Sequence, residues 1–539
     1  MSRDSDSHRN DSSASSERTA LLRNQESDRH PSGTHPPPTG LWPWRPHYWA
    51  AIPVIFLAGL SIGPAVAMNA PLVKELFCER GIPKFFPGNF SSDERAGYGH
   101  HSTPNGPEGD GRCNTAEYSA AIAKFVGINA SLSAIAITLT VRFWAMLSDR
   151  IGRKRSMLLW ASGMCLGQLV PLLVYYVKDM SVYMLWIGGL IEGFAGSILC
   201  VIALTHAYVA DVTHHEQRIV VFGRVMAGYY AGLGLGSALG GLIVKRFGLI
   251  AAFWLMPAMF ALDVVYISFI PESLTMAMLA HGGKKPKPAT IVEVAIEDDR
   301  AIGNVSRPAR TGDSRLERFK KSLLPEQLPG RLGGKHSVFL LLLTCFFVLL
   351  AILGATFQVS TYLLYRFQWT TMQLSNVGTI QGLSRLVALT VLLPFVKRFS
   401  PRTSTSDPAT SISFDLKVVV IGLFIEALTY FLYGASTVGE GFYVGGVTGA
   451  VGSLFFPAIR GVLSQAVSSE MLGQTLGTLA TFESLAAVLA PSLGAWFYGV
   501  TLKVHPSAVF YAASAMAMAS TLLAASVLFS HTREVRSRH

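Results

Sequence analysis

The chain has 539 residues, of which 50 % are hydrophobic and 15 % charged, with a formal net charge of +11 and a mean hydropathy of +0.38. This composition is too apolar for a soluble protein of several domains, so it predicts a polytopic membrane protein. The positive charge does not indicate nucleic-acid binding, because the cations gather in short loops and tails beside apolar runs instead of forming one basic stripe.

The first part of the chain, over 1–46, is rich in Ser, Asp, Arg, His and Pro and has too little apolar surface to fold. We expect a disordered cytoplasmic tail without a cleavable signal. Within it the stretch E-R-T-A-L-L, from Glu17 to Leu22, resembles the acidic dileucine sorting signals of vacuolar and lysosomal membrane proteins. The plasma membrane and the vacuolar membrane both stay open as locations.

Twelve apolar runs follow, each long enough to cross about 30 Å of hydrocarbon. Backbone groups in lipid must be bonded within their own segment and no run alternates like a strand, so we expect twelve transmembrane helices and an all-α fold. The predicted spans are 48–70, 120–146, 156–177, 182–208, 219–244, 250–270, 337–362, 372–396, 416–436, 441–466, 471–497 and 506–530.

The even-numbered connections between these spans carry most of the loop cations, which predicts that they and both termini face the cytoplasm. The longest of them divides the helices six and six. We therefore expect an N-terminal six-helix bundle over 47–270, a cytoplasmic linker over 271–336, a C-terminal six-helix bundle over 337–530 and a short cytoplasmic tail over 531–539.

A long loop over 71–117 falls on the non-cytoplasmic side in this topology. It holds Cys78 and Cys113, the one pair of cysteines in a polar loop, and predicts a disulfide between them. Asn89 begins a glycosylation sequon on the same side and is the predicted glycosylation site. No metal-ligand spacing accompanies these cysteines, and the stretch His214-His215-Glu216 has no further Cys or His at ligand spacing, so we expect no metal site.

Glycine recurs every fourth residue in the fifth span, at Gly228, Gly232, Gly236 and Gly240. One face of this helix therefore lacks side chains, so another helix can pack closely against it. A shift of 254 residues maps the last three onto small residues of the eleventh span, ending at Gly494. The fourth and tenth spans echo each other as Gly189, Gly193, Ser197 and Gly445, Gly449, Ser453. This internal repeat predicts the two-bundle architecture of secondary transporters.

Three motifs resemble the major facilitator superfamily, and the likeness extends over 48–530. The first is A-M-L-S-D-R-I-G-R-K from Ala145 to Lys154, where the family usually begins with Gly. The second is Y-V-A-D-V-T from Tyr208 with Q-R at 217–218 and F-G at 222–223, which is similar to drug–proton antiporters and the proton-coupled folate transporter group. The third is P-E-S-L from Pro271, like many fungal members.

The resemblance implies the major facilitator fold, transport by alternating access, and a gate at the charged loop. The residues of that gate would be Asp149, Arg150, Gly152, Arg153, Lys154, Asp211 and Arg218. One departure weakens the export assignment, because the antiporter signature has a proline where this chain has Ser237.

Ionisable residues inside the spans are candidates for substrate or proton binding, since a charge in the bilayer centre costs several kcal/mol unless it is paired or hydrated. Arg385 and Glu483 lie closest to the middle of their spans. We predict that Arg385 anchors an anionic group and that Glu483 or Glu192 is the protonatable carboxylate; the alternative is that such residues form structural pairs. The remaining candidates are Glu426, Asp263 and Arg224.

These features predict a proton-coupled secondary transporter of a small organic solute rather than an enzyme. No ATP-binding motif is present and no cofactor is expected, so a proton gradient would supply the energy. Export of a drug or metabolite is the first hypothesis; uptake of an organic anion such as a folate-like solute and a transporter-derived nutrient sensor are the alternatives. The expected partners are the solute, protons and the lipid bilayer, with no nucleic acid, and we expect a monomer.

Overall fold

Apolar helices make up the membrane-embedded part of the chain. The computed structural model describes residues 46–83, 113–213, 218–274, 335–398, 408–466 and 469–538, and within these ranges twelve helices are long and apolar enough to cross a membrane. The same ranges contain no strand. The predicted all-α fold with twelve spans is confirmed.

The first six spans follow the short η1 (Tyr48–Ala50) and are α2 (Ala51–Arg80), α4 (Ala116–Ile151), α5 (Arg153–Tyr176), α6 (Met184–Phe194) with α7 (Ser197–Val212), α8 (Arg218–Phe247) and α9 (Leu249–Phe269). The second six are α13 (Lys335–Arg366), α14 (Thr371–Val387) with η6 (Ala388–Leu392) and α15 (Leu393–Arg398), α16 (Pro408–Ala435), α17 (Gly441–Gly452) with α18 (Phe455–Ala466), α19 (Ser469–Thr501) and α20 (Ala508–Arg538).

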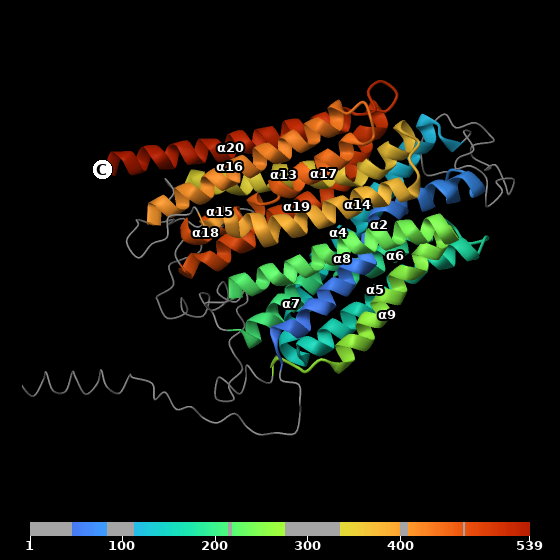
Figure 1. Cartoon of the computed structure of the whole chain (residues 1–539), viewed down its shortest axis with the longest axis horizontal. Helices are drawn as coiled ribbons and strands as arrows, with labels where there is room; N and C mark the ends of the chain where they lie inside the picture. Colours follow the sequence, from blue (N-terminus) through green and yellow to red (C-terminus); the bar gives the residue numbers. More distant parts are fainter. Residues whose placement is uncertain are drawn as a thin grey trace, which may run out of the picture. The chain divides into compact units, whose positions relative to one another are not determined.

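Each set of six helices packs into a bundle. In the first, α2 lies against α8 and α9, and α5 against α6 and α9; in the second, α13 lies against α19 and α20, and α16 against α17, α18 and α20. Figure 1 shows α5 to α9 in the lower half of the view and α13 to α20 in the upper half.

The first two helices are longer than hydropathy predicts. α2 runs to Arg80 instead of ending near residue 70, and α4 begins at Ala116, where the Thr115 side chain accepts a hydrogen bond from the Tyr118 amide. Part of the predicted loop over 71–117 is thus helical, because the last turns of α2 carry charged residues that an apolar-run criterion excludes. Cys78 lies in those last turns and forms the predicted disulfide with Cys113, with 5.8 Å between their Cα atoms. We call this side of the molecule the disulfide end.

The fourth and tenth spans are both broken near their middle. The first break lies between α6 and α7, where Gly196 and Ser197 have φ of +94° and +46°, and the second lies between α17 and α18. Carbonyl oxygens at the first break accept hydrogen bonds from two indoles, Trp144 Nε1 to Phe194 O at 2.9 Å and Trp160 Nε1 to Ser197 O at 2.7 Å. Interrupted helices at matching positions of two repeats are typical of transporter binding regions.

The glycines of α8 bring its backbone directly against α2. A Cβ added at Gly232 would lie 2.1 Å from the Phe56 carbonyl oxygen, and one at Gly236 would lie 2.2 Å from that of Leu60. Ser237, the departure from the antiporter signature, donates a hydrogen bond to the Gly63 carbonyl oxygen at 2.9 Å. The other glycines of the predicted packing set are also in close contact: Gly228 with Ile52, Gly240 with Met68 and Pro64, and Gly494 with Gly354.

The two bundles touch between the middle of the helices and the disulfide end. At the α8–α14 crossing, a Cβ at Gly382 would lie 2.6 Å from the Gly234 nitrogen. At the α4–α19 crossing, the Ser131 and Ser492 hydroxyls are 2.8 Å apart. Nearer the end, Lys503 pairs with Glu117 at 2.7 Å, across the bundles. The Glu117 carboxylate raises the pKa of the Lys503 ammonium above its ordinary value of 10.5, so Lys503 keeps its charge through the neutral range.

Candidate functional site

A cavity lies inside the C-terminal bundle, bounded by α13, α14, α16 and α17, with Val66 of α2 at its edge. The space between its lining atoms is about 610 Å³, counting the part open to solvent. One part of the lining is apolar and consists of Val359, Leu363, Leu374 and Val377; the polar part consists of Thr356, Ser360, Gln381, Arg385, Glu426, Thr429, Tyr430 and Tyr433.

Glycines of α17 make room for the polar side chains of α16. A Cβ at Gly445 would lie 2.3 Å from the Tyr433 ring, and one at Gly452 would lie 2.5 Å from Glu426 Oε2. The glycine echo in the tenth span, which sequence reasoning read as a packing repeat, therefore also shapes the wall of this cavity.

Arg385 extends from α14 into the cavity and is partly buried. Its guanidinium lies over the ring of Tyr230, a residue of α8 in the other bundle, with 5.7 Å to the ring centroid. The π-helical turn η6 follows three residues later, and single π-helical turns are frequent at functional sites. Arg385 is thus held where the two bundles meet.

Glu426 enters the same cavity from α16 and is 3 % exposed. The Tyr430 side chain lies near its carboxyl group, and its Oε2 has no hydrogen-bond partner among the described residues. Arg385 lies within electrostatic range of this carboxyl group. Beside them, Gln381 Nε2 donates to the Tyr433 hydroxyl at 3.1 Å. A cation and an acid predicted separately therefore share one cavity.

Glu483, the acid that sequence position favoured, lies elsewhere. Both of its carboxylate oxygens accept from Arg460 Nη2, at 2.8 and 3.0 Å, between α19 and α18. Its side chain is 23 % exposed and that of Arg460 is 53 % exposed. Glu483 therefore forms an ion pair between two helices, as in the structural alternative that the sequence leaves open.

The other intramembrane candidates belong to the N-terminal bundle. Glu192 accepts a hydrogen bond from Gln168 Nε2 at 2.9 Å, one turn before the break in the fourth span. Asp263 is fully buried on α9, and neither of its oxygens has a hydrogen-bond partner among the described residues. Arg224 is exposed and donates to the Tyr48 hydroxyl at 3.0 Å. None of the three lines the cavity.

The charged loop between α4 and α5 forms a second polar site at the end opposite the disulfide. Arg153, the first residue of α5, pairs with Asp149 in the last turn of α4 and with Asp211 at the end of α7, the second pair at 3.2 Å. Ser273, after α9, donates to the same Asp211 oxygen at 2.9 Å. Residues of all three sequence motifs therefore meet in one network.

Glu272 is the residue of this network that sequence reasoning missed. Its carboxylate oxygens accept the backbone N–H groups of Arg153 at 2.8 Å and Lys154 at 3.1 Å, which caps the N-terminus of α5. Gly152 has φ of +102°, and a Cβ there would lie 2.4 Å from Glu272 Oε2, so this approach requires a glycine. The P-E-S-L motif was the sequence feature that could have pointed to Glu272. Its role as the cap of α5 could not be predicted, because Glu272 is far from α5 in the sequence.

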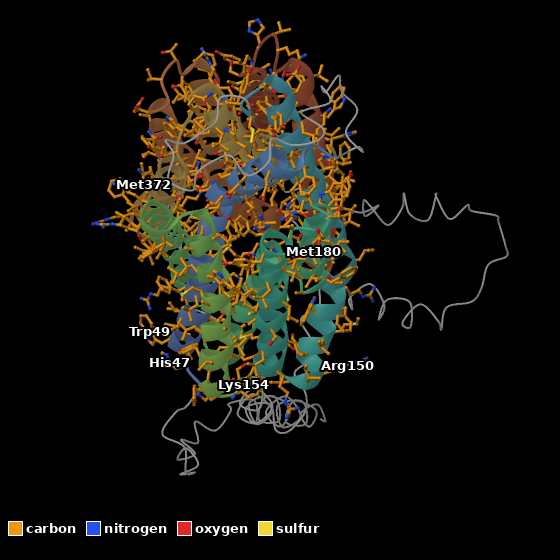
Figure 2. The ribbon with its side chains drawn as sticks, turned by 90° about the vertical axis from the view of Figure 1, so that its right-hand side faces the viewer. His47, Trp49, Arg150, Lys154, Met180 and Met372 are labelled. Atoms are coloured by element: carbon orange, nitrogen blue, oxygen red, sulfur yellow. A yellow bond between two sulfur atoms is a disulfide. The ribbon has the colours of Figure 1, made fainter. Side chains whose placement is uncertain are left out.

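The remaining predicted gate residues lie at or near the surface. Arg150 is exposed, and Lys154 Nζ donates to the Ser268 carbonyl oxygen at 2.8 Å. Figure 2 places Arg150 and Lys154 toward the same end as His47 and Trp49, away from Met180 and Met372. The Arg218 side chain, Asn89, the dileucine stretch and the predicted tail and linker over 1–45 and 275–334 lie outside the described residues. Within the described ranges no three His, Cys, Asp or Glu side chains are grouped as a metal site would require.

Comparisons with known proteins show which family and which proteins this chain is similar to. The model of the family described as "Major Facilitator Superfamily" matches residues 116–407. The chain is 22 % identical over 373 residues to the MFS-type transporter avaJ of Aspergillus versicolor, covering 67 % of this chain and 69 % of that protein. It is 24 % identical over 391 residues to the tetracycline resistance protein, class C, of Escherichia coli, covering 71 % and 82 %.

Two solved structures share the fold. The human organic anion transporter MFSD10 is 18 % identical with a TM-score of 0.53, covering 90 % of this chain and all (100 %) of that one. A D-xylose–proton symporter is 14 % identical with a TM-score of 0.58, covering 89 % of this chain and 97 % of that one.

Proposed function

Because this chain belongs to the major facilitator superfamily, and is a multi-pass transport protein rather than an enzyme, we propose that it is a secondary active transporter that carries a small organic solute and is driven by a proton gradient. The solute would bind in the cavity of the C-terminal bundle, and the bundles would rock about it by alternating access. The membrane would be the plasma or the vacuolar membrane, with both termini in the cytoplasm.

One observation carries this proposal: a cation and a buried carboxyl group, Arg385 and Glu426, line the same cavity. A carboxyl group deep in a membrane protein is costly to hold as a lone charge, so it is a natural site for a transported proton. A neighbouring cation favours the ionised form, and its movement away from or toward the acid would change proton occupancy during the transport cycle.

The network of Asp149, Arg153, Asp211 and Glu272 supports a gate at the opposite end. These groups join the α4–α5 loop to the ends of α7 and α9 within one bundle, so a movement of any of these elements changes the others. We infer that the network holds the N-terminal bundle rigid on that side while the bundles rock.

Two directions of coupling have support. The likeness to a tetracycline resistance protein favours export of solute against entering protons, the first hypothesis from the sequence. The single arginine in the cavity favours an anionic solute that moves together with a proton.

The test is flux into sealed proteoliposomes of known orientation, with and without an imposed pH gradient, across organic anions, cations and neutral drugs. We expect gradient-dependent flux of at least one solute and its loss in Glu426→Gln. Glu440→Gln, at an exposed position beside α17, is the matched control and should behave like the parent protein. Absence of gradient-dependent flux for every solute would refute the proposal.

A further inference from the structure

The charge inventory of the cavity is small. Among the described residues that line it, Arg385 and Glu426 are the charged ones. The titratable neighbours of Glu426 are Tyr430 and Tyr433 on its own helix, with Tyr230 of α8 beyond Arg385. α17 faces it with glycines, and α13 contributes Thr356 and Ser360. The cavity therefore holds one basic and one acidic side chain.

The rest of the lining indicates the shape of the solute. Valine and leucine side chains from α13 and α14 form one wall, and the rings of Tyr430 and Tyr433 form part of another. An amphipathic molecule with a flat apolar body and one charged group matches such a lining. A guanidinium binds a planar oxyanion through two parallel N–H bonds, so Arg385 supplies the recognition group for the charged end.

Charge balance then links the solute to a proton. If an anion pairs with Arg385 while Glu426 is ionised, the cavity holds two negative charges and one positive, and net charge in a low-dielectric interior is costly. A proton on Glu426 restores neutrality. Binding of the anion and binding of the proton must then favour each other by the same factor.

Resting on the proposed transport function, we propose that the solute is a monovalent amphipathic organic anion whose oxyanion group pairs with Arg385, and that it crosses the membrane together with one proton carried by Glu426. The empty site and the doubly occupied site are both electrically neutral, whereas either half-occupied site carries a net charge. Only the neutral forms change conformation readily, so transport is electroneutral and both species move in the same direction. No bond forms or breaks other than the transfer of this proton to the carboxylate.

The experiment uses three probes with one body and different charge: 2-naphthoate, 2-naphthamide and 2-naphthylmethylammonium. Binding to the purified full-length protein in detergent is measured by isothermal calorimetry at several pH values. We expect 2-naphthoate to bind most tightly, and its affinity to fall about tenfold per pH unit once Glu426 loses its proton in the free protein. Tighter binding of 2-naphthylmethylammonium, or no binding of any probe, would overturn the anion assignment.

Variants separate the two roles. Arg385→Gln should abolish 2-naphthoate binding and leave 2-naphthamide binding unchanged, with Arg246→Gln, an exposed arginine at the end of α8, as the control. Glu426→Gln should retain 2-naphthoate binding but lose its pH dependence, and Glu440→Gln should keep it. A pH dependence that persists in Glu426→Gln would overturn the proton assignment.

Flux distinguishes this inference from the proposed function on which it rests. In proteoliposomes, 2-naphthoate should enter with protons and should not respond to a potential set by potassium and valinomycin. If a different solute shows gradient-driven flux against protons, the anion–proton inference fails and the transporter function stands. If no solute shows gradient-driven flux, the proposed function itself fails.

Discussion

At the scale of single residues, Glu272 shows how much one side chain can organise. It accepts four backbone N–H groups, two from the start of α5 and two from Ser273 and Leu274 beside it. A carboxylate at a helix N-terminus satisfies donors that have no partner within the helix and interacts favourably with the helix dipole. Because Glu272 follows α9, it also fixes the end of that helix on the start of α5.

Replacing this carboxylate should destabilise the protein measurably. We expect Glu272→Ala to lower the free energy of unfolding by about 1–2 kcal/mol, since it removes a cap and leaves backbone N–H groups unpaired. Glu272→Gln should cost less, because its amide oxygen still accepts. The measurement is urea or thermal unfolding in detergent micelles, with the exposed Glu440→Gln as the control; an unchanged transition in Glu272→Ala would contradict the role assigned to it.

The candidate residues were identifiable from sequence, but their grouping was not. The sequence identified Arg385, Glu426 and Glu483 as candidates because they are charged residues within apolar runs. Charged residues inside a membrane are rare, so their presence there indicates a functional site. Position within a span measures depth in the bilayer. Which side chains share a cavity depends on how each helix is rotated about its own axis, and this is determined by packing against other helices. Depth therefore favoured Glu483, whereas in the structure Glu426 shares a cavity with Arg385 and Glu483 pairs with Arg460.

At the scale of helices, α8 packs through bare backbone on two faces. Its Gly232 and Gly236 meet α2 inside the bundle, and its Gly234 meets α14 of the other bundle. Side chains are absent where three helices come closest, so dispersion contacts between backbones hold them together. This packing leaves little room for added volume at Gly232, Gly234 and Gly236.

A pair of alanine substitutions on α8 tests this packing. A Cβ at Gly236 would lie 2.2 Å from the Leu60 carbonyl oxygen, whereas a Cβ at Gly223 on the same helix meets nothing within 4 Å. We expect Gly236→Ala to destabilise by about 1–3 kcal/mol through overpacking. Gly223→Ala should be neutral or stabilise by about 0.5–1 kcal/mol, because alanine suits a helix better than glycine. Thermal unfolding of both variants checks this, and equal melting temperatures would contradict it.

Helix boundaries and breaks were predicted less well than helix number. The apolar-run criterion ended the first span near 70 because Lys74, Glu75 and Glu79 follow, although α2 continues past them. The breaks at 195–196 and 453–454 were not predicted, since glycine in an apolar run is compatible with close packing and with interruption. At the first break, Trp144 and Trp160 donate hydrogen bonds from other helices. The local sequence around the break does not reveal these partners.

At the scale of the whole molecule, the twelve spans could be predicted, because hydropathy is a property of the chain alone. The docking of the bundles could not be, because it depends on contacts such as Ser131 with Ser492 between residues far apart in sequence. These contacts lie toward the disulfide end, so we expect the bundles to separate there when the opposite end closes.

Cross-linking the α4–α19 crossing should stop this movement. In a Ser131→Cys, Ser492→Cys double variant with the free cysteines Cys165, Cys200 and Cys345 replaced, a short bifunctional thiol reagent should join the bundles, because the two hydroxyls are 2.8 Å apart. We expect gradient-driven flux to be lost on cross-linking. Each single variant is a control and should keep its flux, and full flux in cross-linked protein would contradict rocking at this crossing.

The disulfide at the same end should contribute to the stability of the whole protein. Cys78 and Cys113 are 35 residues apart, and in the loop-entropy description a closure of this length stabilises by about 2–4 kcal/mol. A Cys78→Ser, Cys113→Ser variant should therefore melt at a lower temperature, and reductant should lower the melting temperature of the parent protein but not of the variant. An equal effect of reductant on both proteins would show that another thiol is responsible.

The bare crossing of Gly234 and Gly382 has a practical consequence. A methyl group is the smallest addition available to protein chemistry, and at Gly382 it would fall 2.6 Å from backbone of the opposite bundle while lying outside the lining of the cavity. We therefore expect the added methyl group of Gly382→Ala to favour conformations in which α8 and α14 are separated at this crossing. Such a protein would present an intact binding cavity on one side of the membrane for long enough to select antibodies against that state alone.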